Sequence, residues 1–364
     1  MRKLKNILVT GGAGFIGSNF IRSLFYERNF QGKVINLDAL TYAGNPANLK
    51  EVQDDFANQY VFVHGNICDA SVVEKIFEQH AIDTVIHFAA ESHVDRSIRT
   101  PDIFLQTNIL GTYVLLNTAL HYWQQDSEFE KKYLFHHIST DEVYGALGAT
   151  GVFTETTSYQ PRSPYSASKA ASDHLVRAYY HTYNLPITIS NCSNNYGPYQ
   201  FPEKLIPLMI LNIVQQKKLP IYGDGKQVRD WIHVSDHNRA VFEILRKGKT
   251  GETYNIGAEN EWENIALLKK LIAIVCKKCS LDVASIEKNI THISDRLGHD
   301  RRYAIDSSKI KHELSWQPEI SFNEGLERTV DWYLQNSKWI ENIISGEYTR
   351  WIDENYNRRD GDTK

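Results

Sequence analysis

A glycine-rich segment near the N-terminus places the strongest constraint on the fold of this chain. Between an apolar run at residues 6–10 and an amphipathic stretch at about 15–29, the chain reads Thr10-Gly11-Gly12-Ala13-Gly14-Phe15-Ile16-Gly17. Two glycine registers fit, G-x-G-x-x-G from Gly12 and G-x-x-G-x-x-G from Gly11. In either register, glycines allow a tight turn and let backbone N–H groups approach a diphosphate at the N-terminus of a helix. The segment therefore predicts a dinucleotide-binding turn.

An acidic residue further along indicates which dinucleotide this turn binds. Asp38 ends the second apolar run, about 20 residues after the glycines, where the ribose-binding acid of such folds lies. A carboxylate hydrogen-bonds a ribose 2′-hydroxyl but repels a 2′-phosphate, and no arginine lies in Ala39–Asn45 to offset that repulsion. We therefore expect NAD rather than NADP.

Alternation of strand-like and helix-like segments defines the fold class. Apolar runs that read as strands lie at 6–10, 33–38, 60–64, 84–88, 133–139 and 186–192. Helical patterns lie between them at about 15–29, 69–80, 101–124 and 164–183. Such alternation predicts an α/β fold with a Rossmann-type doubly wound parallel sheet.

The texture of the sequence changes after about residue 193. Short Gly- and Pro-containing turns appear, with helical patterns near 203–216, 236–247, 263–278 and 322–335. We expect an NAD-binding domain at 1–193 and a smaller mixed α/β domain at 194–355. The charged end of the chain, 356–364, is expected to be disordered.

Composition excludes several classes of function. The chain has 364 residues, 42% of them hydrophobic, and a net charge of −4, which offers no electrostatic case for nucleic acid or an anionic membrane as partner. No uninterrupted apolar run reaches the roughly 18–20 residues that span a bilayer. The four cysteines, Cys68, Cys192, Cys276 and Cys279, have no second Cys/His pair at zinc spacing, so we expect reduced thiols, no metal site and a cytoplasmic location.

Tyr165 and Lys169 form a Tyr-x-x-x-Lys unit that could move a proton together with a hydride. They lie four residues apart in a helical pattern and so share one face. A free tyrosine has a pKa near ~10, but an ammonium group and a positive nicotinamide ring nearby would lower it. The unit occurs often by chance, and the dinucleotide-binding pattern upstream gives it weight.

Two adjacent carboxylates, Asp141 and Glu142, follow a strand-like run and precede Val143-Tyr144-Gly145. Neighbours on a regular strand point to opposite faces, so the chain must turn here if both are to reach one cavity. One interpretation is an acid and a base whose environments separate their pKa values. The alternative is a helix N-cap, a common role of aspartate.

Taken together, these motifs resemble the extended short-chain dehydrogenase/reductases, and more closely the dTDP-glucose 4,6-dehydratases. The resemblance runs from Gly11 to about Trp351. The runs that carry it are Leu40-Thr41-Tyr42-Ala43-Gly44-Asn45, Ala89-Ala90-Glu91-Ser92-His93-Val94-Asp95-Arg96-Ser97, Ser139-Thr140-Asp141-Glu142-Val143-Tyr144-Gly145 and Ser163-Pro164-Tyr165-Ser166-Ala167-Ser168-Lys169. Others are Asn191-Cys192-Ser193-Asn194-Asn195-Tyr196-Gly197-Pro198, Phe201-Pro202-Glu203-Lys204-Leu205-Ile206-Pro207, Arg229-Asp230-Trp231 and Gly298-His299-Asp300-Arg301-Arg302-Tyr303.

The resemblance implies a hydro-lyase that makes dTDP-4-dehydro-6-deoxy-glucose, a precursor of rhamnose and other deoxysugars. Tyr165 would take the proton of the glucose 4-hydroxyl while hydride passes from carbon 4 to NAD. Glu142 would remove the proton from carbon 5 and later return it, and Asp141 would protonate the departing 6-hydroxyl. Hydride would then return to carbon 6. Thr140 would hydrogen-bond the 4-oxygen, and Lys169 would hold the nicotinamide ribose and tune Tyr165.

The resemblance also implies two sets of binding residues. For NAD they are Gly11, Gly14, Phe15, Ile16, Gly17, Asp38, Asn66, Ile67, Ala89, Ala90, Thr107, Tyr165, Lys169 and Asn195. For the substrate they are Ser92, Thr140, Asn194, Lys204, Leu205, Tyr222, Arg229, Asn255, Arg296 and His299. Arg229 and Arg296 suit a diphosphate, because a guanidinium fork matches phosphate oxygens.

Two positions depart from the family pattern, which usually has aspartate where this chain has Asn66 and proline where it has Leu297. Asn66 would lose a charge-assisted hydrogen bond to adenine, at a cost of about 1 kcal/mol. The alternatives are a UDP- or GDP-sugar 4,6-dehydratase, a UDP-glucose 4-epimerase, which has no use for Asp141 and Glu142, and a redox-sensing binding protein that has lost catalysis. The resemblance also implies a homodimer formed through the helices near 101–124 and 164–183.

Overall fold

The large sheet of the computed structural model, which describes residues 1–344, has seven parallel strands. Their order is β10-β6-β5-β4-β1-β2-β3. The strands are β1 (Asn6–Thr10), β2 (Lys33–Asp38), β3 (Tyr60–His64), β4 (Thr84–His87), β5 (Leu134–Thr140), β6 (Ile187–Cys192) and β10 (Thr253–Ile256). This is the doubly wound order, and it confirms the predicted fold class. The tail expected to be disordered, 356–364, lies outside the described residues.

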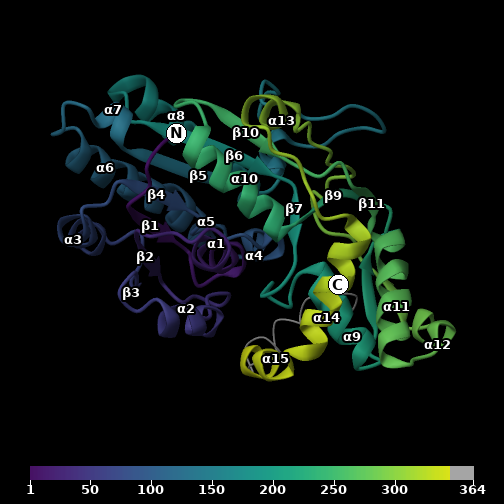
Figure 1. The fold of residues 1–364 in the computed structure, drawn as a ribbon. Helices are drawn as coiled ribbons and strands as arrows, with labels where there is room; N and C mark the ends of the chain where they lie inside the picture. The colour runs from purple at the N-terminus through teal and green to yellow at the C-terminus, as the bar shows by residue number, and fades with distance from the viewer. Residues whose placement is uncertain (345–364) are drawn as a thin grey trace.

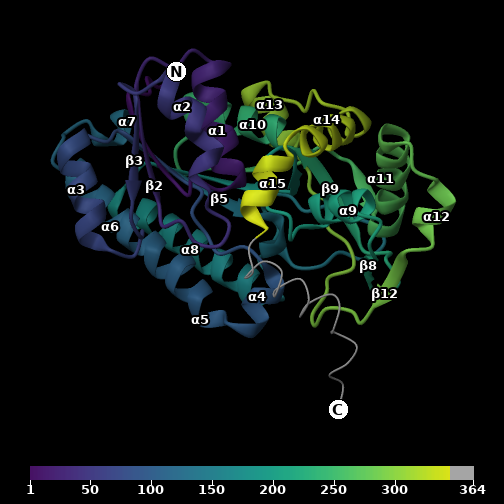
Figure 2. The same ribbon diagram turned by 90° about the horizontal axis from the view of Figure 1, so that it is seen from below.

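Helices cover both faces of this sheet, as Figures 1 and 2 show. The longer ones are α1 (Phe15–Tyr26), α3 (Ala70–His80), α6 (Thr112–Trp123) and α8 (Pro164–Tyr183). Local caps explain several starts: Asp69 accepts the N–H groups of Ser71 and Val72 at α3, and Ser163 begins α8 with a capping box. The helix expected at 15–29 ends at Tyr26, because the chain reaches Asn29 in a left-handed conformation with φ of 48°.

The helix expected at 101–124 is interrupted in its middle. It consists of α5 (Pro101–Phe104), a π-helical segment η2 (Leu105–Gly111) and α6. Asn108, within η2, exchanges hydrogen bonds with the Glu91 backbone and donates to Ser168 Oγ. By length and composition the stretch from Pro101 to Trp123 could cross a membrane, although no single apolar run in it is long. Here its buried side packs against α3 and α8, as a core helix does.

A smaller body of the protein lies beyond the carboxyl ends of the large sheet's strands. It holds a three-stranded sheet, β11 (Glu261–Glu263), β9 (Val228–His233) and β7 (Asn194–Tyr196), and a two-stranded one, β12 (Ile290–Ile293) and β8 (Leu219–Tyr222). Helices α9 (Leu205–Val214), α11 (Asn264–Cys279) and α14 (Phe322–Gln335) pack on one another around a separate apolar core. Short helices α12 (Val283–Glu287) and α15 (Ser337–Ile343) lie at its edge.

After β7, α9, β8 and β9, which belong to the smaller body, the chain returns to the large sheet. Helix α10 (Val234–Lys247) packs on α1, β10 pairs with β6, and α13 (Ser308–Leu314) covers β10. A single cut at residue 193 therefore does not separate the two sheets. The division of the chain into 1–193 and 194–355 stays a prediction. It assigns α10, β10 and α13 to the smaller domain, whereas these three elements pack on the large sheet and its helices.

Candidate functional site

A cavity of about 330 Å³ lies at the carboxyl ends of β1, β2, β4 and β5. Parallel α/β sheets bind ligands at this edge. Its lining includes every residue predicted for the cofactor: Gly11, Gly14, Phe15, Ile16, Gly17, Asp38, Asn66, Ile67, Ala89, Ala90, Thr107, Tyr165, Lys169 and Asn195. The structure thus gathers residues from positions 11 to 195 around one space, and the role assigned to each stays a prediction.

The glycine turn separates the two registers that the sequence left open. Gly11 has φ of +71°, and a Cβ there would lie 2.6 Å from the backbone nitrogen of Ala89. Gly14 faces the cavity, where a Cβ would meet only the Gly11 carbonyl oxygen at 3.3 Å. Gly12 does not line the cavity; its Cβ would collide with the side chain of Asn36. The register from Gly11 therefore supplies the turn and the open approach that a diphosphate needs.

Asp38 closes the cavity at the end of β2. Its Oδ2 accepts the N–H of Ala13 at 2.9 Å and its Oδ1 accepts that of Leu40 at 2.8 Å, so the carboxylate is fixed in place. Burial raises the pKa of Asp38, and these two hydrogen bonds oppose the rise. No arginine occurs among the described residues that line this cavity. The lining thus suits a ribose with free hydroxyls.

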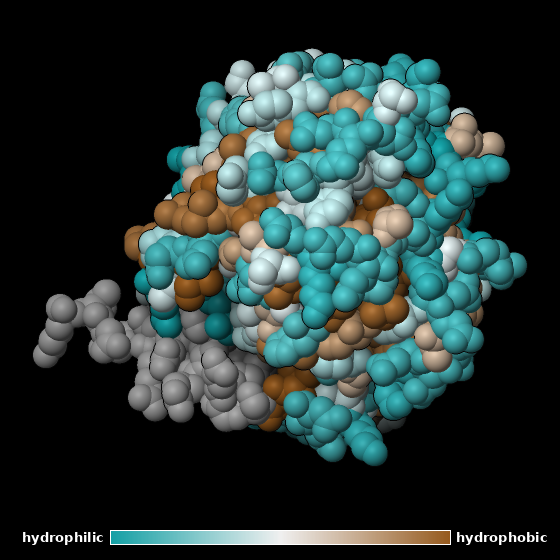
Figure 3. Space-filling model, turned by 90° about the vertical axis from the view of Figure 1, so that its left-hand side faces the viewer, coloured by the Kyte–Doolittle hydropathy of each residue, from teal (hydrophilic) through white to brown (hydrophobic). Residues whose placement is uncertain are grey.

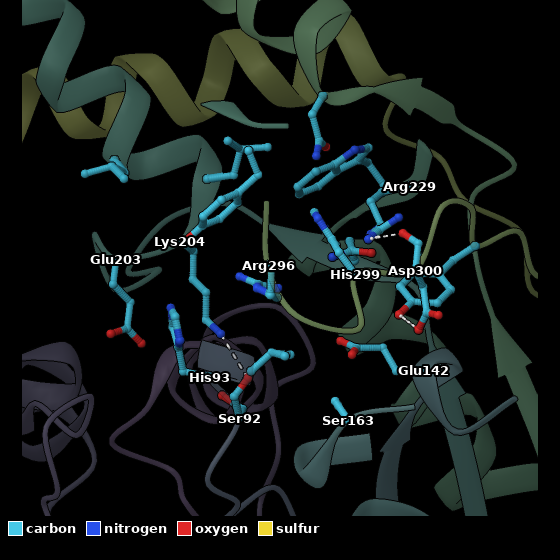
Figure 4. Close-up of a pocket in the computed structure, with 18 of the residues that line it drawn as sticks. Ser92, His93, Glu142, Ser163, Glu203, Lys204, Arg229, Arg296, His299 and Asp300 are labelled. Atoms are coloured by element: carbon cyan, nitrogen blue, oxygen red, sulfur yellow. Dashed lines mark hydrogen bonds between the residues drawn. The ribbon is translucent and has the colours of Figure 1, made fainter. Parts of the chain in front are cut away.

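A second cavity, of about 180 Å³, opens beside the first between the large sheet and the smaller body. Seven residues line both, so the two form one cleft: Ser92, Glu142, Asn194, Asn195, Gln200, Glu203 and Lys204. Figure 4 shows Glu142 reaching into the second cavity, with Lys204, Arg296 and Arg229 around it. Other predicted substrate residues on this lining are Leu205, Tyr222 and His299, while Thr140 lies on the first cavity.

Asn255 is the predicted site residue that the structure places elsewhere. It lies on β10, fully buried, where its Oδ1 accepts from the hydroxyl of Tyr144 at 2.8 Å and its Nδ2 donates to the Phe153 carbonyl at 3.2 Å. It lines neither cavity. Its assignment to the substrate site therefore stays a prediction, and in this structure its side chain hydrogen-bonds within the large domain instead.

Asn264 is the residue that sequence reasoning missed. It begins α11, lines the second cavity, and has a buried side-chain oxygen without a hydrogen-bond partner among the described residues. A buried polar atom of this kind is costly unless a ligand or water satisfies it. The Glu263-Asn264 pair at the start of an apolar helical pattern was the only sequence signal, and it fits an ordinary helix start equally well.

The chain turns at the two adjacent carboxylates, as the sequence requires if both are to face one space. Strand β5 ends at Thr140, and a 3₁₀ helix, η3 (Asp141–Tyr144), begins at once. The N-cap is Thr140, whose Oγ1 accepts the N–H of Glu142 at 3.2 Å; Asp141 does not serve as the cap. Both Asp141 and Glu142 line the first cavity, and Glu142 also lines the second.

Different surroundings separate these two carboxyl groups chemically. Burial raises the pKa of Asp141 well above its usual range, and the negative charges of Glu142 and Asp230 add to the rise. Burial also raises the pKa of Glu142, but Arg229, Arg296 and Lys204 oppose it. The arrangement favours a protonated Asp141 beside an ionised Glu142, which is the pairing of an acid with a base.

Tyr165 and Lys169 lie on α8, one turn apart and both buried. Burial raises the pKa of Tyr165 well above 10, with a further contribution from Glu142, whereas a hydrogen bond with Thr140 lowers it. Lys169 Nζ donates to the Ile138 carbonyl at 2.8 Å, and burial lowers its pKa to about 8. The lowered tyrosine pKa expected from the sequence is therefore absent from the protein alone; that expectation also required a bound nicotinamide.

The cationic side of the cleft is held by contacts across the two bodies. Arg296 donates from Nε and Nη2 to Asp95 at 3.0 and 2.7 Å, and Lys204 donates to the Ser92 carbonyl at 3.1 Å. Arg229 donates to the Asp300 carbonyl at 2.9 Å (Figure 4). Leu297, one of the two departures from the family pattern, is 75% exposed beside Arg296. Asn66, the other, lines the cofactor cavity.

Comparison with known proteins agrees with this geometry. Residues 8–329 match the family model described as GDP-mannose 4,6 dehydratase. The chain is 53% identical to dTDP-glucose 4,6-dehydratase 1 of Escherichia coli K12 over 363 residues, which cover 97% of this chain and 99% of the relative. It is 53% identical to the dTDP-glucose 4,6-dehydratase of Neisseria meningitidis over 350 residues, covering 95% and 98%.

Solved structures extend the comparison to three dimensions. The dTDP-glucose 4,6-dehydratase of Bacillus anthracis, in complex with NAD, is 45% identical with a TM-score of 0.82, covering 93% of this chain and 99% of that one. The UDP-glucose 4-epimerase of Thermotoga maritima, with UDP-glucose, is 30% identical with a TM-score of 0.79, covering 91% and 99%. The chain belongs to the dTDP-glucose 4,6-dehydratase family, within the extended short-chain dehydrogenase/reductases.

Proposed function

We propose that the chain is an NAD-dependent hydro-lyase that converts dTDP-glucose into dTDP-4-dehydro-6-deoxy-glucose. The observation that carries the proposal is the pair Asp141 and Glu142, which meets Tyr165 and Lys169 on the wall of one cleft. An enzyme that only oxidises or epimerises carbon 4 needs the tyrosine and the lysine but has no use for a buried acid beside a buried base. Elimination of water needs both.

The cofactor cavity fits NAD in three respects. Its glycine turn leaves open space in front of Gly14, its acid Asp38 is fixed where a ribose hydroxyl would lie, and its lining offers no arginine for a 2′-phosphate among the described residues. When bound, NAD supplies the acceptor for the hydride of carbon 4 and the donor of the hydride to carbon 6. The NAD-bound relative from Bacillus anthracis supports the same assignment.

Oxidation at carbon 4 is the task of the tyrosine. Tyr165 takes the proton of the 4-hydroxyl, and the Thr140 hydroxyl beside it hydrogen-bonds the 4-oxygen. In the protein alone the Tyr165 pKa is high, so the positive charge of the cofactor, together with Lys169, has to lower it before the phenolate forms. Lys169 would also hold the nicotinamide ribose when NAD is bound.

Elimination and protonation divide between the two carboxyl groups. Once carbon 4 is a ketone, the proton on carbon 5 is acidic, and Glu142 removes it as the base. Asp141, kept protonated by burial and by neighbouring negative charges, gives its proton to the departing 6-hydroxyl. Glu142 then returns a proton to carbon 5. Positioned groups of this kind contribute about 10²–10⁴-fold each to a rate.

The substrate diphosphate binds to the cations of the second cavity. Arg229, Arg296 and Lys204 converge there, and they lie close enough to Glu142 to lower its pKa. Three acidic residues share this lining, namely Glu142, Glu203 and Asp300. A diphosphate bound at the same place pairs with these cations, so their positive charge does not fully compensate the negative charge of Glu142. Asn264 adds a polar contact that this structure leaves open.

The test is incubation of the purified protein with dTDP-glucose without added cofactor, followed by alkali-induced absorbance of a 4-keto sugar. We expect each enzyme molecule to form many molecules of product, because NAD is restored in each turnover. UDP-glucose, UDP-galactose and GDP-mannose serve as parallel substrates. Turnover of one of these, with none of dTDP-glucose, would contradict the proposed substrate.

We further propose that the protein is a homodimer and works in the cytoplasm. Large apolar side chains on α5, η2, α6 and α8 remain 45–54% exposed in the single chain: Ile103, Leu105, Leu110, Tyr113 and Tyr183. Figure 3 shows several apolar patches between the polar side chains of that face, with a larger one toward its left edge. Four unpaired cysteines fit a reducing compartment. Light scattering at a mass of one chain, or of four, would contradict the dimer.

A further inference from the structure

Helix α8 carries a stripe of polar side chains that is longer than its Tyr-x-x-x-Lys unit. Tyr165, Lys169, Asp173 and Arg177 follow one another at every fourth position, so they share one face of the helix. Asp173 is fully buried, with 0% exposure, and takes no part in the chemistry proposed above. A buried carboxylate is costly unless it is paired and hydrogen-bonded, so its presence here calls for a physical reason.

The contacts of Asp173 lead to Lys169. Asp173 Oδ2 accepts from Ser139 Oγ and from the Tyr159 hydroxyl, both at 2.8 Å. Its Oδ1 lies 3.2 Å from His137 Nε2, and the same nitrogen lies 3.4 Å from Lys169 Nζ. His137 Nε2 therefore lies close to both the carboxylate and the ammonium group. All three side chains are buried. His137 and Ser139, both on β5, thus connect this strand to Asp173 and Lys169 on α8.

Lys169 needs a negative charge nearby if it is to stay protonated away from water. The titratable groups that act on it are Asp173 on α8, Cys192 on β6, His137 on β5 and His87 on β4. Burial holds the pKa of both histidines far below 6.5 and raises that of the Cys192 thiol to about 12, so these three are uncharged at neutral pH. Among these groups Asp173 alone is charged.

We propose that Asp173 is a positioning residue for the proposed dehydration: its charge keeps Lys169 protonated, and both side chains are held against the same ring nitrogen of His137. The inference rests on the proposed role of Lys169 beside Tyr165 and the cofactor. It assigns the buried carboxylate a task in the reaction, although Asp173 touches neither cavity. Hydroxyl donors from Ser139 and Tyr159 keep Asp173 ionised, which completes the arrangement.

The first test is the pH profile of kcat for Asp173→Asn. Removing the carboxylate charge lets Lys169 lose its proton at a lower pH, so the fall in kcat at alkaline pH should begin about one pH unit or more below that of the unmodified enzyme. Tyr159→Phe is the matched control, because it removes a hydrogen bond from the same carboxylate and leaves the charge. Its alkaline limb should not move. If kcat of Asp173→Asn fell at the same alkaline pH as kcat of the unmodified enzyme, the proposal would be overturned.

The second test needs no turnover, so it separates this proposal from the proposed function. Asp173→Asn leaves a buried ammonium group unpaired, and Lys169→Met removes that group. In a thermal-unfolding cycle of the two variants and their combination, the loss of Tm from Asp173→Asn should be clearly smaller in the Lys169→Met background. An equal loss in both backgrounds would show that Asp173 serves packing alone. This cycle decides even if dTDP-glucose is not the substrate.

If Asp173→Asn does not fold, Lys169→Met alone can test whether the two charges interact. In the unmodified protein burial acts to raise the Asp173 pKa, but His137, Lys169 and Arg177 together lower it below its usual value. The stabilising effect of Asp173 is therefore lost as pH falls through that lowered pKa. Without the ammonium group the carboxyl takes up its proton at higher pH. The Tm deficit of Lys169→Met should therefore shrink between about pH 8 and about pH 5. A deficit that is constant over this range would contradict the proposal.

Discussion

The two halves of the cleft, the cofactor cavity and the substrate cavity, are lined by different kinds of groups. In the cofactor half, the glycine turn and the strand ends beside it bring backbone and small side chains to the wall, with Gly11, Gly14 and Ala89 among them. The substrate half is lined by long side chains from loops and helix starts, with Lys204, Arg229 and Arg296 among them. A backbone wall tolerates almost no added atom, whereas a wall of side chains can lose one member and keep its shape. The two carboxyl groups sit where the halves meet.

This difference explains where the pKa values are set. In the cofactor half, burial dominates, so it raises the pKa of Asp141 and of Tyr165. In the substrate half, the cations compensate for burial, so Glu142 remains the more acidic of the adjacent pair. One strand end thereby supplies an acid and a base one residue apart. Changes in the two halves should have different consequences.

The largest effect should come from Asp141→Asn, at the junction. An amide cannot give a proton to the departing hydroxyl, so kcat should fall by about 10²–10⁴-fold. Oxidation at carbon 4 does not need this residue, so substrate should still reduce bound NAD, visible as absorbance of the reduced cofactor. Loss of that absorbance together with turnover would show that Asp141 acts in the first step as well.

In the cofactor half, Gly11→Ala should abolish cofactor retention. The added Cβ would lie 2.6 Å from the Ala89 nitrogen at a positive φ, and the strain should cost about 1–3 kcal/mol of stability. Gly148→Ala is the matched control, since its Cβ would meet nothing within 4 Å. NAD content and Tm of the two purified variants check this. Normal NAD content in Gly11→Ala would break the contrast between the two walls.

In the substrate half, Arg229→Gln should raise KM by about 10–100-fold, as expected for loss of a charge-assisted hydrogen bond. The guanidinium also donates to two backbone carbonyls, which a glutamine amide replaces only in part, so Tm is measured together with KM. Arg301→Gln removes an exposed arginine paired with Asp224 and should leave KM unchanged. Steady-state kinetics of both variants decide. Equal KM values would remove Arg229 from the diphosphate site.

A smaller effect distinguishes two asparagines. Asn264→Ala should raise KM by about fivefold, as for the loss of one neutral hydrogen bond, and leave Tm unchanged. Asn255→Ala should leave KM unchanged and lower stability by about 1–3 kcal/mol, because the Tyr144 hydroxyl and the Phe153 carbonyl lose their partner. The opposite pattern would restore Asn255 to the substrate site.

The smallest predicted effect is the position of the acid limb in the pH profile. The pKa of Glu142 is raised, and the base must be ionised, so activity should be lost as pH falls through a value above the ordinary 4.5. Asp141 and Lys169 must both stay protonated, and burial lowers the pKa of Lys169 to about 8, so activity should fall as pH rises through that value. The profile of kcat should be a bell. Activity that persists well below pH 4.5 would contradict the raised pKa of Glu142.

Sequence reasoning succeeded where one local pattern determines one structure. The glycine turn, Asp38 and the alternation of strands and helices depend on neighbouring residues, and the sheet follows from them. It missed Asn264, because the substrate half of the cleft is assembled from distant segments whose placement depends on tertiary packing. It also named Asn255, which lines neither cavity. The return of β10 to the large sheet and the π-helical segment within 101–123 also left no periodic signal. Asp173 shares a helix face with Lys169, but only the structure shows that β5 buries it.

The division of labour between Asp141 and Glu142 is tested most directly by Glu142→Gln in deuterated water. The purified variant is incubated with dTDP-glucose, and the sugar is recovered and examined for deuterium at carbon 5, while reduced cofactor is followed by absorbance. We predict reduction of the bound cofactor, no deuterium at carbon 5 and no 4-keto-6-deoxy product. Deuterium at carbon 5 at the rate of the unmodified enzyme would show that another residue is the base, and the account of this site would be wrong.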